Sequence, residues 1–130
     1  MKTILVDAIF CFIQEENERF FIFQEMYRLL EKYPNRKILL TGANDEQIEK
    51  WGLNKAPYEV FTLKKNPDKT NPEYYNIMLK NFGFKKDEVI YFEHNPEAVR
   101  SAESIGIKSY YYDNDKKDLK KLKEFFDKNL

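Results

Sequence analysis

The side chains that could do chemistry in this 130-residue sequence lie where apolar segments end. Asp7 interrupts the apolar run ILVDAIFCF, and a carboxylate at the end of a buried strand costs desolvation free energy unless another group pairs with it. Thr41 and Lys69 supply a hydroxyl and an ammonium group, and Glu93 and His94 supply a second carboxylate and an imidazole. These groups could bind an anion, bind a metal ion or transfer protons.

The elements that must position these residues alternate along the chain. Strand-like apolar segments occupy residues 2–7, 37–41, 58–63, 89–92 and 108–112. Helical segments occupy residues 15–33, 44–51, 71–83, 95–106 and 115–128. The alternation predicts βαβ units and a parallel sheet with helices on both faces, within a single three-layer α/β domain spanning residues 1–130. In such sheets function gathers at the carboxyl ends of the strands, so we expect Asp7, Thr41, Lys69 and Glu93 to converge there.

The helical segments differ in the signals that define them. The helices that begin near residues 71 and 95 each start with an Asn–Pro pair, which supplies a cap and a proline suited to the first turn. The helix expected over residues 15–33 rests on spacing, because Phe20, Phe23, Tyr27 and Leu30 would share one face.

Composition excludes several classes of function. Lysine plus arginine equals aspartate plus glutamate, 22 each, so no nucleic acid and no anionic membrane is expected as a partner. No apolar stretch approaches the roughly 18 residues of a membrane span, and no basic-then-apolar leader precedes the first strand. The single cysteine, Cys11, excludes an internal disulfide and fits a reducing, cytoplasmic location.

Four segments, in order, resemble the motifs of the haloacid dehalogenase (HAD) superfamily. Asp7 follows the first strand, LLTGAN resembles the second motif, and DKTNPEYY resembles the lysine motif. The segment VIYFEHNPEAVRSAESIGI resembles the fourth motif and its trailing helix. The resemblance covers nearly the whole chain and implies a Rossmann-like HAD fold with strand order 3-2-1-4-5.

The resemblance also implies a role for each residue. Asp7 would be the nucleophile that forms an aspartyl-phosphate. Thr41 and Lys69 would complete the catalytic set and, with Gly42, bind the phosphoryl oxygens. Asp7 and Glu93 would be the ligands of Mg²⁺, the cofactor of the family.

Several positions depart from the family pattern. Ile9 stands where the family's general acid/base aspartate is expected, and its loss should reduce the rate by about 10²- to 10⁴-fold. Phe10 and Cys11 replace a glycine and a threonine. Glu93 and His94 replace an acidic pair, and Mg²⁺ accepts histidine poorly, so any Mg²⁺ site would be weak.

The sequence also predicts that the site has no cap domain. A single helix is expected between Asp7 and the second strand, and only residues 64–68 separate the third strand from Lys69. An open site of this kind suits a phosphorylated or macromolecular partner better than a small metabolite.

Three functional hypotheses follow, and they leave open whether the chain is an enzyme. The first is an eroded phosphohydrolase site, in a pseudoenzyme or a very weak phosphatase. The second is an active, divergent HAD-type phosphatase with Asp7 as nucleophile and His94 or Glu93 as substitute acid/base. The third is an interaction module that keeps only the scaffold and meets a partner through the aromatic segment Tyr110–Tyr112. A zinc site is not expected, because His94 has no cysteine or histidine neighbour in the sequence.

Overall fold

The computed structural model describes residues 1–130, and its centre is a parallel five-stranded sheet. The strands are β1 (Thr3–Asp7), β4 (Lys37–Thr41), β5 (Glu59–Thr62), β6 (Val89–Glu93) and β7 (Lys108–Tyr111). They lie in the order β5-β4-β1-β6-β7. Counted along the chain within this sheet, that order is 3-2-1-4-5, so the predicted topology is confirmed.

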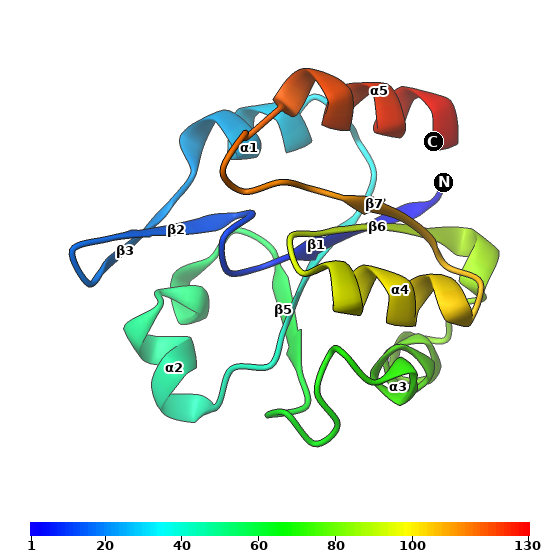
Figure 1. Ribbon diagram of the computed structural model, residues 1–130, viewed down its shortest axis with the longest axis horizontal. Helices are drawn as coiled ribbons and strands as arrows, with labels where there is room; N and C mark the ends of the chain where they lie inside the picture. The colour runs from blue at the N-terminus through cyan, green and yellow to red at the C-terminus, as the bar shows by residue number, and fades with distance from the viewer.

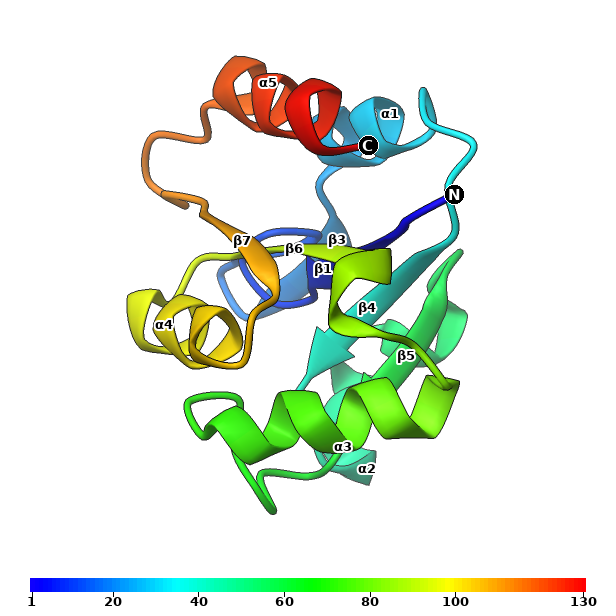
Figure 2. The same cartoon turned by 90° about the vertical axis from the view of Figure 1, so that its right-hand side faces the viewer.

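Helices cover both faces of the sheet and complete a three-layer architecture. Helices α1 (Gln24–Leu30) and α5 (Leu119–Asn129) lie together on one face, and α3 (Pro72–Phe82) and α4 (Pro96–Ser104) lie on the other (Figures 1 and 2). Helix α2 (Asp45–Lys50) lies toward the end of the sheet from which the hairpin β2–β3 projects (Figure 1). Two short 3-10 helices, η1 (Leu53–Lys55) and η2 (Lys86–Glu88), lie in the connections. None of the helices combines the length and the apolar character that a membrane crossing requires.

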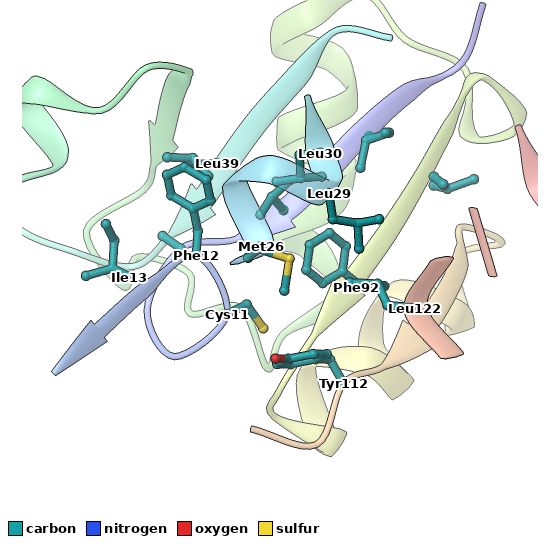
Figure 3. Packing of buried hydrophobic residues seen from close by; sticks show 14 of the residues in the cluster. Cys11, Phe12, Ile13, Met26, Leu29, Leu30, Leu39, Phe92, Tyr112 and Leu122 are labelled. Atoms are coloured by element: carbon teal, nitrogen blue, oxygen red, sulfur yellow. The ribbon is translucent and has the colours of Figure 1, made fainter. Parts of the chain in front are cut away.

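The sheet separates two apolar cores because successive side chains of a strand point to opposite faces. In β1, Ile4 and Val6 join the larger core under α1 and α5, whereas Leu5 joins the smaller core against α3. Figure 3 shows the larger core, which includes Cys11 and Tyr112. All five residues of β1 are buried, and Asp7, the last of them, lies at the carboxyl edge of the sheet.

The predicted helix over residues 15–33 is wrong in its first half. Residues in this region form an antiparallel hairpin of β2 (Ile13–Glu16) and β3 (Arg19–Ile22), and the helix begins only at Gln24. The two residues of the turn, Asn17 and Glu18, have φ angles of 52° and 63°. Positive φ at both central residues is the geometry of a type I′ turn, which matches the twist of paired strands and favours a hairpin over a helix.

Helices α2, α3 and α4 begin as predicted, whereas α5, predicted from residue 115, begins at Leu119 after its cap Asp118. The side chains of Asn71 and Asn95 accept hydrogen bonds from the backbone N–H groups two residues further on, and a proline occupies the first turn of each helix. Asn44 forms a capping box with Gln47 at the start of α2. These caps set the directions in which the polypeptide leaves the carboxyl edge.

No cap domain is present in the segment between β1 and β4 or in the segment between β5 and α3. The hairpin and α1 separate β1 from β4, in place of the single helix predicted there, and residues 63–71 connect β5 to α3. The carboxyl edge of the sheet is therefore bordered by this hairpin, by α2 and by short loops, and not by a cap domain.

Candidate functional site

The carboxyl ends of three neighbouring strands bring the predicted site residues together. Asp7, Thr41 and Glu93 are the last residues of β1, β4 and β6, and Lys69 reaches them from the loop before α3. Asp7, Thr41 and Lys69, together with Gly42, line a cavity of about 190 Å³. The convergence expected from the strand pattern is present in the structure.

Lys69 bridges the two carboxylates at the base of this site. Its Nζ lies 2.7 Å from Oδ1 of Asp7 and 2.7 Å from Oε1 of Glu93. A third, longer hydrogen bond of 3.4 Å runs to the carbonyl oxygen of Leu40. An ammonium group has three donors, so these contacts use all of them.

His94 bridges the same two carboxylates from the other side. Its Nδ1 hydrogen-bonds to Oδ2 of Asp7 and lies 3.1 Å from Oε2 of Glu93. Its backbone N–H also donates to Oδ2 of Asp7, at 3.2 Å. Asp7, Lys69, Glu93 and His94 thus form a closed ring of alternating formal charges, which we call the four-charge ring.

Further donors complete the hydrogen bonding of the two carboxylates. Oε1 of Glu93 accepts a hydrogen bond from the Tyr91 hydroxyl, and Oε2 accepts one from the backbone N–H of Asn95 at 3.0 Å. The Cys11 thiol donates to Oδ2 of Asp7, with Sγ at 3.3 Å. Every carboxylate oxygen in the four-charge ring therefore has at least one protein donor, as buried charges require.

Burial and charge act in opposite directions on the ionisable groups of the ring. Burial disfavours the ionised form of Asp7, but the positive charges of Lys69 and His94 outweigh it and hold the pKa of Asp7 well below its usual value. Burial likewise lowers the pKa of Lys69, and the charges of Asp7 and Glu93 reverse this and raise it well above 10.5. For His94, burial is outweighed by the hydrogen bonds to Asp7 and Glu93, which raise its pKa to about 10.

Thr41 and the residues beside it form the polar wall of the cavity. The Thr41 Oγ1 accepts a hydrogen bond from the backbone N–H of Ala43 at 3.2 Å, and its own hydroxyl proton can still be donated to a ligand. Lys65 also lines the cavity and takes part in none of the ion pairs of the chain. Lys65 is therefore a cation at the cavity that is not already neutralised by a carboxylate.

The opposite wall is apolar. Ile9, Phe10 and Trp51 line the cavity, and Ile9 places an alkyl side chain where the HAD resemblance expects a general acid/base. The Phe10 ring meets the His94 ring edge-on, with centroids 5.3 Å apart. Phe10 has a φ of 73°, a left-handed conformation that is uncommon for a residue with a Cβ and that fits the family's glycine at this place.

Sequence reasoning missed several residues of the site. The sequence pattern gave no reason to place Trp51 or Lys65 at the cavity. Trp51 is the C-cap of α2 and Lys65 lies in the loop after β5, and the fold determines where both come to lie. Asp68 lines the cavity too, and its position directly before Lys69 was the available signal. Cys11 contacts Asp7, four residues before it in the sequence. A tight turn after β1, in which the N–H of Phe12 donates a hydrogen bond to the carbonyl oxygen of Ala8, brings the two together.

The residues present do not suit Mg²⁺. The predicted ligands Asp7 and Glu93 are close enough to share a cation, but their oxygens already accept hydrogen bonds from Lys69 and His94. Mg²⁺ demands oxygen ligands in near-octahedral geometry, so a nitrogen at this position excludes it unless His94 moves away.

A softer metal has a better donor set than the sequence indicated. The ligand atoms of Asp7, Cys11 and His94 all lie within 4.8 Å of one another. Cys11 is therefore a neighbour of His94 in space, although no cysteine lies beside His94 along the chain. Burial, followed by the charges of Asp7 and Glu93, raises the pKa of Cys11, which opposes the thiolate that zinc needs.

The aromatic surface expected at Tyr110–Tyr112 is not continuous. Tyr112 is buried in the larger core, and Tyr110 packs against Phe125 of α5 with ring centroids 5.3 Å apart. Only Tyr111 is exposed, with 48% of its surface accessible. One exposed tyrosine is ordinary for a protein surface and does not define a docking site.

Comparisons with known proteins identify the fold. No protein-family model matches the sequence, and no curated protein matches it. Among solved structures, a HAD family enzyme from Bacteroides thetaiotaomicron, an aspartate-to-alanine mutant in complex with magnesium and inorganic phosphate, is similar with a TM-score of 0.62 and 12% identity. That similarity covers 85% of this chain and 93% of the other.

Two further structures agree. An uncharacterized protein from Listeria monocytogenes has a TM-score of 0.62 and 12% identity, over 85% of this chain and 78% of that one. A provisional beta-phosphoglucomutase from Thermotoga maritima has a TM-score of 0.56 and 15% identity, over 85% of each chain. The chain therefore has the HAD-like fold, and the fold expected from the motif order is confirmed.

Proposed function

We propose that this HAD-like chain is a pseudoenzyme, or a phosphatase of very low rate, whose eroded site binds phosphate-like anions weakly. The observation that carries the proposal is the closed four-charge ring beside an apolar wall. Asp7, the nucleophile by resemblance, has both oxygens held by Lys69 and His94. Ile9 lies at the cavity in the acid/base position and cannot transfer a proton.

Neither substitute acid/base is well placed. Glu93 is fully buried, does not line the cavity, and accepts hydrogen bonds from Tyr91 and Lys69. His94 does line the cavity, but its pKa of about 10 keeps it protonated near neutral pH. A protonated imidazole cannot act as the base that activates water against an aspartyl-phosphate, so the alternative of an efficient divergent phosphatase has less support.

The open carboxyl edge bears on the nature of the ligand. No cap closes over the cavity, so a phosphorylated group on a macromolecule could reach Thr41, Gly42 and Lys65 from solvent. A cytoplasmic setting fits the buried and unpaired Cys11. We regard a phosphorylated protein as a better-suited partner than a small metabolite, which this site could not enclose.

The test of the proposed function is a phosphatase assay with p-nitrophenyl phosphate, with and without MgCl₂. The parent chain should turn over far more slowly than about 1 s⁻¹, at or only just above the rate of Asp7→Asn, because the nucleophile is held in ion pairs and Ile9 cannot transfer a proton. Turnover of about 1 s⁻¹, the lower end of the usual enzyme range, that disappears in Asp7→Asn would overturn the proposal.

A gain-of-function variant gives a complementary test. Ile9→Asp together with His94→Asp restores an acid/base and a metal-ligand carboxylate on an otherwise unchanged scaffold. The double variant should acquire Mg²⁺-dependent hydrolysis, whereas the matched Ile9→Asn, His94→Asn variant should not, since an amide at position 9 cannot transfer a proton.

A further inference from the structure

We infer that the His94 side chain stands in the place of the divalent cation that the HAD resemblance implies for this site, so that the four-charge ring is complete without metal. The inference deepens the proposed function, because it concerns how the same cluster balances its charges. It does not require that the chain be inactive, and it is tested by metal binding and not by turnover.

The geometry of the two bridges carries the inference. Lys69 joins Oδ1 of Asp7 to Oε1 of Glu93, and His94 joins the remaining oxygens, Oδ2 of Asp7 and Oε2 of Glu93. A cation bound where the His94 ring lies would need those same two oxygens as its ligands. The His94 Nδ1 therefore takes up the space and the ligand atoms that such an ion would need.

Charge counting leads to the same result. Asp7 and Glu93 are 1% and 0% exposed, and buried carboxylates must be compensated by nearby positive groups. Lys69 alone would leave one negative charge uncompensated. The His94 ring is the group placed to balance it, because its Nδ1 hydrogen-bonds to Asp7 and lies 3.1 Å from Oε2 of Glu93.

The fold also holds His94 in this position. The backbone N–H of His94 donates to Asp7, so the residue is anchored by its main chain as well as its ring. The Phe10 ring packs edge-on against the imidazole, with ring centroids 5.3 Å apart. These contacts make displacement of His94 by a hydrated dication unfavourable, because Mg²⁺ gives up its water reluctantly.

The experiment is a calorimetric titration of MgCl₂ into the parent chain and into His94→Asn. Asparagine keeps a donor near the position of Nδ1 but cannot carry charge, so the variant leaves one carboxylate uncompensated. The parent should give no saturable binding at millimolar MgCl₂. His94→Asn should bind Mg²⁺ at least tenfold more tightly than the parent. A variant away from the site, Asn114→Asp, controls for the general effect of one added unit of negative charge.

Two results would overturn the inference. Binding of Mg²⁺ to the parent as tightly as to His94→Asn would show that His94 does not exclude the ion. Absence of binding to both would show that this is not a cation position at all. If His94→Asn fails to fold, the parent decides alone: the ring ¹⁵N shifts of its one histidine should not move during the MgCl₂ titration, and a shift toward free imidazole would contradict the inference.

A titration with Co²⁺ separates this role from that of a soft-metal ligand. Cys11 and His94 could bind such an ion together with Asp7. A thiolate-to-cobalt charge-transfer band in the parent would show that a metal ion binds at Cys11, beside Asp7, and would overturn the inference that the ring is complete without metal. The absence of this band in the parent supports a ring that needs no metal.

Discussion

The ammonium group of Lys69 lies 2.7 Å from Oδ1 of Asp7, although 62 positions separate the two residues along the chain. The Asp7 side chain is 1% exposed and the Lys69 side chain 14%, so water solvates the ion pair only slightly. Desolvation of such a pair offsets much of its attraction. The pair is therefore best understood as part of the larger ring with Glu93 and His94, and removal of any member should affect all of them.

The first prediction concerns stability. Lys69→Met keeps most of the side-chain volume but leaves Asp7 and Glu93 facing each other with only His94 between them. Breaking a buried ion pair from one side costs about 3–5 kcal/mol, and we expect a loss of that order in the free energy of unfolding measured with urea.

A neighbouring lysine provides the matched control. Lys64 pairs with Asp45 at 3.1 Å, but both side chains are more than half exposed. Lys64→Met should therefore cost only about 0–1 kcal/mol. Equal losses for the two variants would mean that the ring contributes no more than a surface pair.

The elements that position the ring could be predicted from the sequence, whereas its closure could not. Buried strands that end in Asp7, Thr41 and Glu93 followed from apolar runs, and parallel topology then placed these ends at one edge. The contact of His94 with Asp7 depends on how the chain turns directly after β6, where His94 is the first residue beyond the strand. This turn has no periodic signal in the sequence.

The hairpin shows a different limit of pattern reasoning. Phe20, Phe23, Tyr27 and Leu30 have helical spacing, but only Tyr27 and Leu30 lie within α1. Phe20 instead packs on Trp51, with ring centroids 5.8 Å apart, from strand β3. Short aromatic segments serve either type of element, and here the two-residue turn decided between them.

The second prediction concerns the protonation of His94. Its folded-state pKa of about 10 lies above the ordinary value of 6.5, so the ring should be an imidazolium throughout the neutral range. Because the chain has one histidine, its ring ¹⁵N and ¹³C shifts are unambiguous. They should remain those of the charged form from pH 6 to 8, a range in which a free histidine titrates.

The same shift determines how stability depends on pH. A group whose pKa is raised by folding stabilises fully below its unfolded value, and this contribution is lost as pH rises through the folded value. The difference in free energy of unfolding between the parent and His94→Asn should therefore be largest below pH 6.5 and should decline as pH rises toward about 10. A difference that grew with rising pH would contradict the assignment.

The third prediction concerns Lys65, which lines the cavity without a carboxylate partner. Lys65→Ala should weaken the binding of inorganic phosphate severalfold, because it removes a positive charge that nothing in the ring neutralises. Lys64→Ala is the control, since Lys64 is adjacent in sequence but paired with Asp45 and absent from the cavity lining. Chemical-shift titration at fixed ionic strength distinguishes the two, and equal weakening would indicate only a general charge effect.

The last prediction concerns the anion affinity of the ring itself. In the parent chain Lys69 donates hydrogen bonds to Asp7, Glu93 and Leu40. We therefore expect phosphate to bind with a Kd only near 1 mM, which corresponds to a binding free energy of about 4 kcal/mol. Asp7→Asn removes one of the two carboxylates that neutralise Lys69. It should therefore tighten phosphate binding about tenfold, a change of about 1.4 kcal/mol in binding free energy.

Two further variants complete this test. Lys69→Ala should weaken phosphate binding below detection, because the ring then carries a net negative charge. Asp45→Asn removes an exposed carboxylate that lies outside the cavity lining, and it should leave the affinity unchanged. Calorimetry on the parent and these variants would show whether the charges of the ring control the anion. Identical affinities for the parent, Asp7→Asn and Lys69→Ala would mean that the site has no anion pocket, and a scaffold that serves only protein interactions would then be the better hypothesis.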